Sequence, residues 1–324
     1  MKKIFATILM GLLACAMLGG CKEKGQSDDL IVKVGSLKGP TSIGLVKLMD
    51  DAEKGLTDNR YEFTMAVTAD ELLPKMISGD LDIALVPANV ASVLCNKTDG
   101  GVVAVDINTL GVLYAVSGDD SISSISDLAG KTIFVTNKGT TPDYAIQYLL
   151  TSNGLSVEEV TLEYKSEATE VAACLKENPE AVGILPQPFV TVACAQNEEL
   201  SAVLDLTKEW DGIQTENGSR LVTGVTIVRK DFFDNNEKAV KAFMEDHKNS
   251  AEYVNTNADD AANLVVNLGI IEKAPIAAKA IPNCNITYID GEDMKKALSG
   301  YLEVLYSQDA SSIGGTLPGE EFYY

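Results

Sequence analysis

From Leu30 to Arg229 the chain alternates short apolar, β-branched runs with longer stretches in which apolar residues recur at helical spacing. A short apolar run suits a buried strand, and the amphipathic stretch after it suits a helix packed on the sheet. The alternation predicts βαβ units and a largely parallel sheet, which is an α/β fold. The predicted strands contain the sequences LIVKVGSL, YEFTMAV, LDIALV, GVVAV, LGVLYAV, KTIFV, VTLEY, AVGIL, LSAVLDL and RLVTGVTIV.

Beyond Arg229 the pattern changes, and we expect no further strand. Helical periodicity is found over residues 236–255, 258–268, 274–282 and 291–307, and an irregular tail comes after them. A chain of this length can bury two separate hydrophobic cores.

Two strand-turn-helix junctions occur twice, at a shift of about 100 residues. The segment VKVGSLKGPTSIGLVKLM resembles IFVTNKGTTPDYAIQYLL, and DIALVPANVASVL resembles AVGILPQPFVTVA. The coinciding residues are Lys38 with Lys138, Gly39 with Gly139, Thr41 with Thr141, and Pro87 with Pro186. Because the two junctions recur in the same order, the repeat predicts two α/β lobes of similar architecture.

Each repeated turn precedes a predicted helix whose first N–H groups lack partners within the helix, and such helix ends attract anions. Glycine lets a ligand approach the backbone, and the Thr and Ser hydroxyls add donors, although these residues also cap helices without any ligand. Open α/β sheets bind ligands beyond the carboxyl ends of their strands, so we expect both turns to face one cleft. The candidate contacts are Lys38, Gly39, Pro40, Thr41 and Ser42 in the first turn, and Gly139, Thr140 and Thr141 in the second.

Polar or aromatic residues at other junctions are further candidates. Asn89 and Gln187 come after strand ends, where an amide can orient a ligand, although Asn89 could equally cap a helix. Thr223 and Tyr114 lie where the chain crosses between the lobes. Trp210, in a predicted polar loop, is either a lid over the cleft or packed against its own lobe, and we slightly favour packing.

The formal net charge of −21 argues against nucleic acid and against a basic membrane-binding surface. The only histidine, His247, is predicted on a solvated helix face, which excludes a site built from several histidines. No serine or cysteine nucleophile has a histidine base nearby, and HExxH, P-loop and Cys/His metal motifs are absent from the sequence. We therefore expect no enzyme, metal or cofactor, although carboxylate-based catalysis stays open.

The first residues predict export. Lys2 and Lys3 precede an apolar stretch, Ile4 to Leu18, of signal-peptide length. It ends in Leu-Gly-Gly-Cys21, which resembles the lipobox of bacterial lipoproteins, whereas a rival motif ending at Cys15 leaves a shorter apolar core. We expect a signal peptide over residues 1–20, lipidation at Cys21 and a polar tether over residues 21–29.

Four cysteines lie beyond the export segment, and none forms a CxxC pair. Cys174 and Cys194 could form a disulfide in an exported protein, but isolated buried thiols are an equal alternative.

The lipobox, VGSLKGPTSIGLVKLM, ISGDLDIALVPANVASVL and GGTLPGEEFYY together resemble the substrate-binding lipoproteins of ABC importers, in particular the nitrate, sulfonate and thiamine-precursor group. The resemblance implies a type II periplasmic-binding-protein fold. Lobe I would comprise residues 30–112 and 223–324, lobe II residues 113–222, and two crossing strands would join them.

The resemblance also implies a function. A monomer outside the cytoplasm, anchored to the cell membrane by lipid such as palmitate, would capture a small solute by hinge closure. It would deliver the solute to ABC permease and ATPase subunits. The solute would be a sulfonate-like anion or a thiamine-precursor-like pyrimidine. Arg220 could pair with an anion, although a surface position is favoured. An enzyme on the same fold, or a lipoprotein co-receptor, is the alternative.

Overall fold

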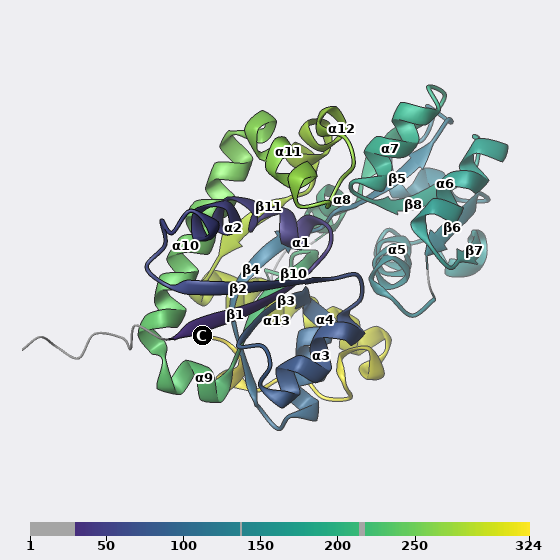
Figure 1. Ribbon diagram of the computed structural model, residues 1–324. Coiled ribbons are helices and arrows are strands. Elements are labelled where there is room, and N and C mark those ends of the chain that lie inside the picture. Colours follow the sequence, from purple (N-terminus) through teal and green to yellow (C-terminus); the bar gives the residue numbers. More distant parts are fainter. Residues whose placement is uncertain (1–29, 137, 214–217) are drawn as a thin grey trace, which may run out of the picture. The chain divides into compact units, whose positions relative to one another are not determined.

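The computed structural model describes residues 30–136, 138–213 and 218–324, and it contains two β-sheets (Figure 1). The first sheet has the strand order β11-β4-β10-β3-β1-β2, and the second has the order β7-β6-β8-β5-β9. The strands of the first sheet are β1 (Ile31–Leu37), β2 (Arg60–Ala66), β3 (Ile83–Pro87), β4 (Val102–Leu110), β10 (Val222–Arg229) and β11 (Ile286–Ile289). Those of the second are β5 (Leu113–Ser117), β6 (Thr132–Thr136), β7 (Thr161–Lys165), β8 (Val182–Pro186) and β9 (Ser201–Asp205).

Both sheets contain the same unit. Strand β1 pairs in parallel with β2 and β3, as β6 does with β7 and β8. An antiparallel strand then joins the outer side of the third strand: β10 beside β3 in the first sheet, and β5 beside β8 in the second. The repeat seen in the sequence is therefore a repeat of topology, and the predicted α/β fold with two similar units is confirmed.

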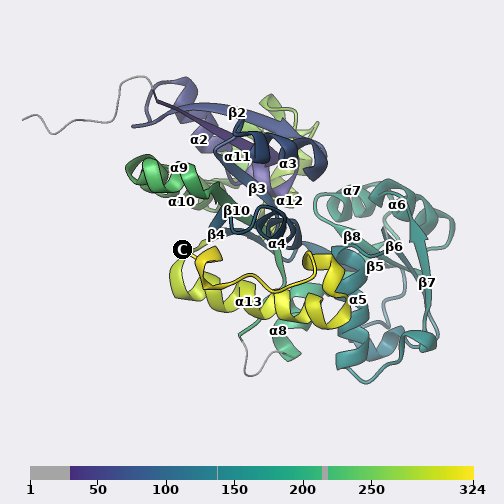
Figure 2. The same ribbon diagram turned by 90° about the horizontal axis from the view of Figure 1, so that it is seen from below.

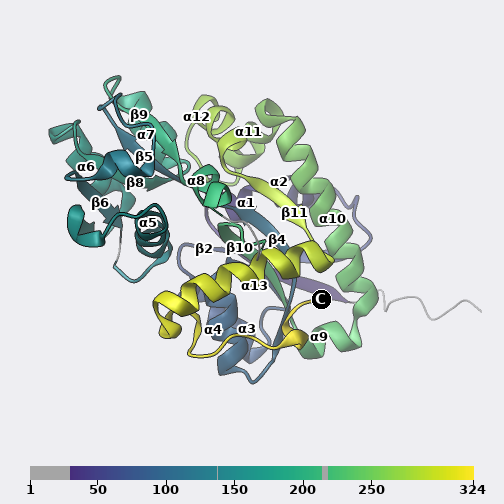
Figure 3. The same ribbon diagram turned by 180° about the vertical axis from the view of Figure 1, so that it is seen from behind.

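Helices cover both faces of each sheet (Figures 2 and 3). One apolar cluster joins the helices α1 (Pro40–Ile43), α2 (Val46–Glu53), α10 (Glu237–Thr256), α11 (Ala258–Asn267) and α12 (Ala274–Ala280). The opposite face of the first sheet carries α3 (Ala69–Ser78), α4 (Ala88–Lys97) and α13 (Gly291–Gln308), while α9 (Lys230–Asn235) leads from β10 into α10. The second sheet has α5 (Thr141–Ser152) and α8 (Leu206–Ile213) on one face, and α6 (Ala168–Glu177) and α7 (Phe189–Gln196) on the other.

Local sequence explains where α3 begins and ends. Thr68 and Glu71 form a capping box, in which the Glu71 carboxylate accepts the Thr68 N–H at 3.0 Å. Gly79 ends the helix in a left-handed conformation, with φ of 81°, which costs glycine little.

Two elements differ from the prediction. Strand β11 lies beyond Arg229, where we expected none, and it pairs antiparallel with β4. Its four residues are too few to show a periodicity of their own. Helix α8 occupies the first half of the predicted polar loop, because Leu206, Trp210 and Ile213 have helical spacing that the surrounding polar residues obscured.

The predicted signal peptide, the tether and Cys21 lie outside the described residues. Within the described part of the chain, no helix combines the length and apolar character needed to cross a membrane. The four cysteines beyond the export segment are free thiols, so Cys174 and Cys194 are not joined.

The first crossing between the sheets is tightly held at Gly111, which separates β4 from β5. The Leu110 N–H donates to the Asn285 carbonyl at 3.0 Å, and the Thr207 hydroxyl donates to the Gly111 carbonyl at 2.9 Å. A Cβ placed on Gly111 would lie 2.2 Å from the Thr207 Oγ1 and 2.6 Å from a methyl of Leu221. Thr207 of α8 and Leu221, which precedes β10, therefore pack against this point, and only glycine fits without displacing them.

We expect Gly111→Ala to destabilise the protein by about 1–3 kcal/mol, because the added methyl group overpacks a site lined by Thr207 and Leu221. Chemical denaturation measures this change. Gly130→Ala is a control for the loss of a glycine, since its Cβ meets nothing within 4 Å, although its φ of 74° imposes some strain. A Gly111→Ala protein as stable as the wild type would show that the crossing is not closely packed.

Candidate functional site

The first repeated turn connects β1 to α1. Gly39 has φ of 141°, and the hydroxyl groups after it turn back toward the end of the strand. The Thr41 hydroxyl donates to the Leu37 carbonyl at 2.8 Å, and the Ser42 hydroxyl donates to the same carbonyl at 2.6 Å. Both side chains are buried, and Lys38 is exposed. The turn thus fixes two hydroxyl oxygens beyond the carboxyl end of β1.

The second turn, between β6 and α5, repeats this geometry one residue earlier than the alignment predicted. The Thr140 hydroxyl donates to the Thr136 carbonyl at 3.3 Å, so Thr140, and not Thr141, corresponds to Thr41. Thr141 instead hydrogen-bonds the buried Tyr301 of α13. The shift between the two turns is 99 residues, the same as between Pro87 and Pro186. The Lys-Gly pair lies one residue later in the second turn than in the first, and this match shifted the sequence alignment by one residue.

A buried carboxylate completes the second turn. Asp143 accepts the N–H of Gly139 at 2.8 Å with one oxygen. Its other oxygen accepts the Tyr164 hydroxyl at 2.8 Å and the Gln147 amide at 2.5 Å. The position that corresponds to Asp143 in the first turn is Gly44. The first turn therefore has no carboxylate at this position, whereas in the second turn the Asp143 carboxylate fills it.

The return strand β10 brings further residues to the first turn. A Cβ on Gly224 would lie 2.4 Å from the Asn108 Oδ1 and 2.8 Å from the Thr41 methyl carbon. Both side chains therefore pack against the backbone of Gly224, where a larger residue would not fit. Gly224 also pairs with Pro87, at the end of β3. The neighbouring Thr223 has a buried Oγ1 that makes no hydrogen bond within the described residues. A buried hydroxyl without a partner is costly, and a ligand could satisfy it.

A series of contacts runs from Asn89 to the second turn through the 3₁₀ helix at Ala310–Ile313. The Asn89 amide donates to the Ser312 carbonyl at 3.3 Å, and the Tyr144 hydroxyl donates to the Asp309 carboxylate at 3.1 Å. Burial, together with the bond to Asp309, raises the pKa of Tyr144 to about 12. Hydrogen bonds from Ser311, and a weaker contribution from Tyr144, lower the pKa of Asp309.

Tyr114 and Gln187 meet at a second place along the boundary between the two sheets. They line a cavity of about 370 Å³ together with residues of α7 and of the segment after α12. The Tyr114 hydroxyl donates to the Asn283 carbonyl at 3.1 Å, and Gln187 accepts the Thr191 hydroxyl at 2.8 Å. The described contacts do not link this pair directly to the first turn, so their role as ligand contacts stays a prediction.

Trp210 packs in the core. Its indole has no exposed surface, its Nε1 donates to the Ser219 hydroxyl at 3.2 Å, and its ring lies between Tyr148 and Tyr301 at centroid distances of 4.4 and 5.7 Å. The lid alternative is wrong in this structure, because α8 turns the side chain inward. Trp210 is therefore removed from the candidate ligand contacts.

His247 also differs from the prediction of a solvated position. Its side chain is fully buried, and its Nδ1 lies 3.3 Å from the Asp106 carboxylate. The helix that carries it, α10, is covered by α2 on one side and contacts β11 on another. Periodicity marked this face as polar, but it could not reveal that a short unpredicted strand would cover it.

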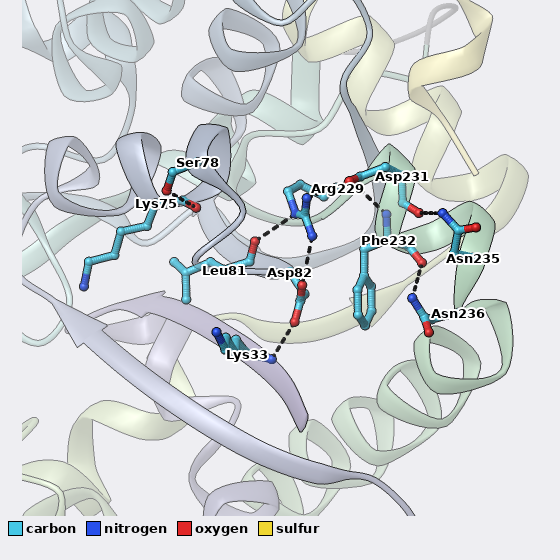
Figure 4. Close-up of polar contacts among 10 residues, drawn as sticks. All are labelled: Lys33, Lys75, Ser78, Leu81, Asp82, Arg229, Asp231, Phe232, Asn235 and Asn236. Carbon is cyan, nitrogen blue, oxygen red and sulfur yellow. Dashed lines mark hydrogen bonds and ion pairs between the residues drawn. The ribbon is translucent and has the colours of Figure 1, made fainter. Parts of the chain in front are cut away.

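None of the three arginines of the chain lies at the repeated turns. Arg229 ends β10 and binds the start of β3 (Figure 4): its guanidinium donates to the Leu81 carbonyl at 3.1 Å and pairs with Asp82 at 3.1 Å. This is the opposite end of the sheet from Gly224. Arg220 pairs with Asp211 at the surface, as favoured, and Arg60 is exposed at the start of β2.

Sequence reasoning missed three residues that the structure brings to the turns, namely Asn108, Tyr144 and Asp309. One signal was present for Asn108, since the otherwise apolar stretch VVAVDINTL contains Asp106 and Asn108, and every residue of the resulting strand is buried. Polar side chains in a fully buried strand need partners, which predicts a polar network. Nothing local marked Asp309, which comes into contact with the second turn only through the packing of α13.

Residues 45–203 match the family model described as "ABC transporter, phosphonate, periplasmic substrate-binding protein". The chain is similar to the crystal structure of an ABC transporter protein from Parabacteroides distasonis, with 21% identity, a TM-score of 0.76, and coverage of 91% of this chain and 99% of that one. It is also similar to the periplasmic aliphatic sulphonate binding protein SsuA from Escherichia coli, with 13% identity, a TM-score of 0.69, and coverage of 90% and 95%.

A further similar structure is the alkanesulfonate-binding protein SsuA from Xanthomonas axonopodis pv. citri bound to MOPS, with 14% identity, a TM-score of 0.64, and coverage of 89% and 94%. At these identities the structures show a common fold along nearly the whole chain. None of the curated proteins matches this sequence.

We expect Arg229→Met to lower the free energy of unfolding by about 2–3 kcal/mol, because it leaves the buried Asp82 carboxylate without its guanidinium partner. Ligand affinity should stay within about twofold of the wild type, since Arg229 lies at the far end of β10. Denaturation and calorimetric titration measure the two quantities. Arg220→Met, which breaks an exposed pair, is the control and should change stability by less than about 0.5 kcal/mol. A large loss of affinity in Arg229→Met would contradict this assignment.

Proposed function

We propose that the chain is a substrate-binding protein of the ABC-transporter type, and that it captures a small organic oxyanion, a phosphonate or a sulfonate, between its two repeated turns. The family match supports the class of protein. The unpartnered Thr223 hydroxyl beside Gly224 is the observation that supports this location for the ligand. It is a buried donor at a strand end, where open α/β sheets bind their ligands.

We propose that hydroxyl and backbone groups, and not a guanidinium, bind the anion. All three arginines are engaged or exposed elsewhere, so the polar groups near the first turn are those of Thr41, Ser42, Asn108 and Thr223. In the ligand-free structure the Thr41 and Ser42 hydroxyls donate to the Leu37 carbonyl, so on binding they would turn their protons toward the anion. Lys38 supplies a positive charge at the exposed edge of the turn.

The two turns would bind different parts of the ligand. Asp143 already fills the second turn with a carboxylate, and Asp309 lies against Tyr144 nearby. A second anion at that turn would be repelled. The charged group therefore belongs at the first turn, and the organic part of the solute faces the second.

Closure would occur about the two chain crossings, one near Leu110 to Val116 and the other near Leu221 to Val225. We propose that residues 30–112 with 223–324 form one lobe and residues 113–222 the other, in accordance with the strands that each sheet contains. Ligand contacts made only in the closed state would shift the population toward closure. The Tyr144–Asp309 bond joins the two parts in the present structure.

We further propose that the protein acts as a monomer outside the cytoplasm, delivers its solute unchanged to ABC permease and ATPase subunits, and is anchored by a lipid on Cys21. The transporter family supports delivery in place of catalysis. The Leu-Gly-Gly-Cys sequence after an apolar segment supports the anchor.

Ligand binding is tested by thermal unfolding of the protein without residues 1–21 in the presence of methylphosphonate, ethanesulfonate or an aminopyrimidine. We expect stabilisation by the phosphonate or the sulfonate, which increases with ligand concentration. Native mass spectrometry of the purified protein would show one bound solute, and its mass before and after incubation would show whether it is altered. Stabilisation by the aminopyrimidine alone, or by none of the three, would overturn the proposed solute class.

Replacement of Thr41 by Val should weaken anion binding about tenfold or more, because it removes the hydroxyl that would turn from the Leu37 carbonyl to the charged group. Thr140→Val, the geometrically matched change in the second turn, should weaken it by less than about threefold, since that turn is already occupied by Asp143. Calorimetric titration gives both constants. Equal losses in the two variants would contradict the proposed orientation of the ligand.

We expect Cys21→Ala to release the full-length protein from the membrane fraction, because the acyl acceptor is lost. Cys15→Ala is the matched control and should leave the protein anchored. Fractionation of producing cells, combined with mass spectrometry of the mature N-terminus, measures both. Release by Cys15→Ala and not by Cys21→Ala would assign the anchor to the rival motif.

A further inference from the structure

A buried polar chain connects the only histidine of the protein to the first turn. The His247 Nδ1 lies 3.3 Å from one oxygen of Asp106, whose other oxygen accepts the Thr226 hydroxyl at 2.8 Å. The Asn108 amide donates to the Thr226 hydroxyl at 3.2 Å, and the Thr109 hydroxyl donates to the Asn108 Oδ1 at 2.9 Å. All five side chains are buried, so water does not weaken these bonds.

This chain ends where the proposed ligand would bind. The Asn108 Oδ1 and the Thr41 methyl carbon both lie within 2.8 Å of the position that a Cβ on Gly224 would take. The bond to Thr226, on the neighbouring strand β10, holds the Asn108 amide in one orientation. The His247–Asp106 contact, in turn, holds the carboxylate to which Thr226 donates.

Helix α10 also holds the other end of the turn directly. The Ser250 hydroxyl, one helical turn after His247, donates to the Gly44 carbonyl at 2.7 Å and accepts the Leu48 N–H at 3.1 Å. A Cβ on Gly44 would lie 3.8 Å from the His247 Nε2. One face of α10 therefore contacts the C-terminal end of α1 through Ser250 and His247. The same face is connected to the N-terminal end of α1 indirectly, through the polar chain that begins at His247.

The partners of His247 determine its tautomer. Asp106, as a carboxylate, accepts hydrogen bonds, so Nδ1 carries the proton. Within the described residues Nε2 is buried without a hydrogen bond, and its ring neighbours are aromatic: Tyr288 lies edge-on at a centroid distance of 5.7 Å, and Phe243 lies at 5.6 Å. The ring is thus fixed by one polar contact, the contact to Asp106.

We propose that His247 is a positioning residue for ligand binding, which acts through Asp106, Thr226 and Asn108 to fix the amide against Thr41. It does not touch the ligand. The inference rests on the proposed function, because it assumes that the ligand binds at the first turn. A merely structural histidine would contribute to stability but would leave the affinity of the folded protein unchanged.

The pair His247→Asn and His247→Leu tests the inference. Asn and Leu both remove the outer part of the ring, but only Asn keeps a nitrogen donor where Nδ1 stands. We expect His247→Leu to weaken binding of methylphosphonate or ethanesulfonate at least tenfold, and His247→Asn to remain within about threefold of the wild type. Thr226→Val, which breaks the chain in the middle, should resemble His247→Leu.

Phe243→Leu provides the matched control on the same helix. Phe243 is fully buried and contacts the imidazole, but it makes no polar bond to the chain. We expect it to lower the melting temperature as much as the His247 variants while changing affinity by less than twofold. Affinities that track melting temperature across all four variants would overturn the inference, as would an unchanged affinity in His247→Leu.

A readout without ligand separates this inference from the proposed function. The NMR signal of the Thr41 methyl group, assigned from its absence in Thr41→Ser, should move in His247→Leu and Thr226→Val and stay in place in Phe243→Leu. If neither anion binds the wild type but the signal moves in this way, the proposed solute class fails and the positioning role stands. If the anions bind and the signal does not move, the positioning role fails and the proposed function stands.

Discussion

The insertion of β10 between β3 and β4 is the constraint on which the rest of the structure depends. This strand comes after the whole second sheet in sequence, yet it pairs antiparallel with two strands formed much earlier in the chain. Its two ends have different tasks. Near its start, Gly224 meets Thr41 and Asn108, and at its end Arg229 binds the loop before β3. The strand thus fixes the candidate site at one edge of the sheet from an anchor at the other.

The separation of these ends also explains why the proposed anion site contains no arginine. The partly buried Arg229 is needed where Asp82 would otherwise lose its cationic partner. At the turns the chain places hydroxyl groups fixed to strand-end carbonyls, and a glycine where the second turn has Asp143. Hydroxyl groups that turn toward the ligand could bind an anion without a positive residue, provided that carboxylates are kept away from the site.

The sequence predicted the parts of the fold that local periodicity and repetition can reveal. The repeated turns led to the correct topology, because a strand, a turn and a helix in the same order twice imply the same unit twice. Strand β11, the burial of His247 and the position of Asp309 were beyond reach, because each depends on which distant element covers a given face. The pairing of Thr41 with Thr141 was wrong for a different reason. Identical residues align at a shift of 100, whereas the equivalent backbone positions of the two turns are 99 residues apart.

The two copies of the repeat also show how one architecture yields two unlike surfaces. Backbone and hydroxyl groups are shared, since Thr41 and Thr140 make the same bond to the strand four residues before them. The two turns differ at the third residue after this threonine. Gly44 leaves room for α10 to approach with His247 and Ser250, whereas Asp143 closes the second turn with its own carboxylate. The first turn depends for its geometry on a helix far along the chain, and the second on its own residues. The packing of α10 would therefore affect a ligand held between the turns only through the first turn. This asymmetry is the reason why we propose a role in binding for the buried histidine.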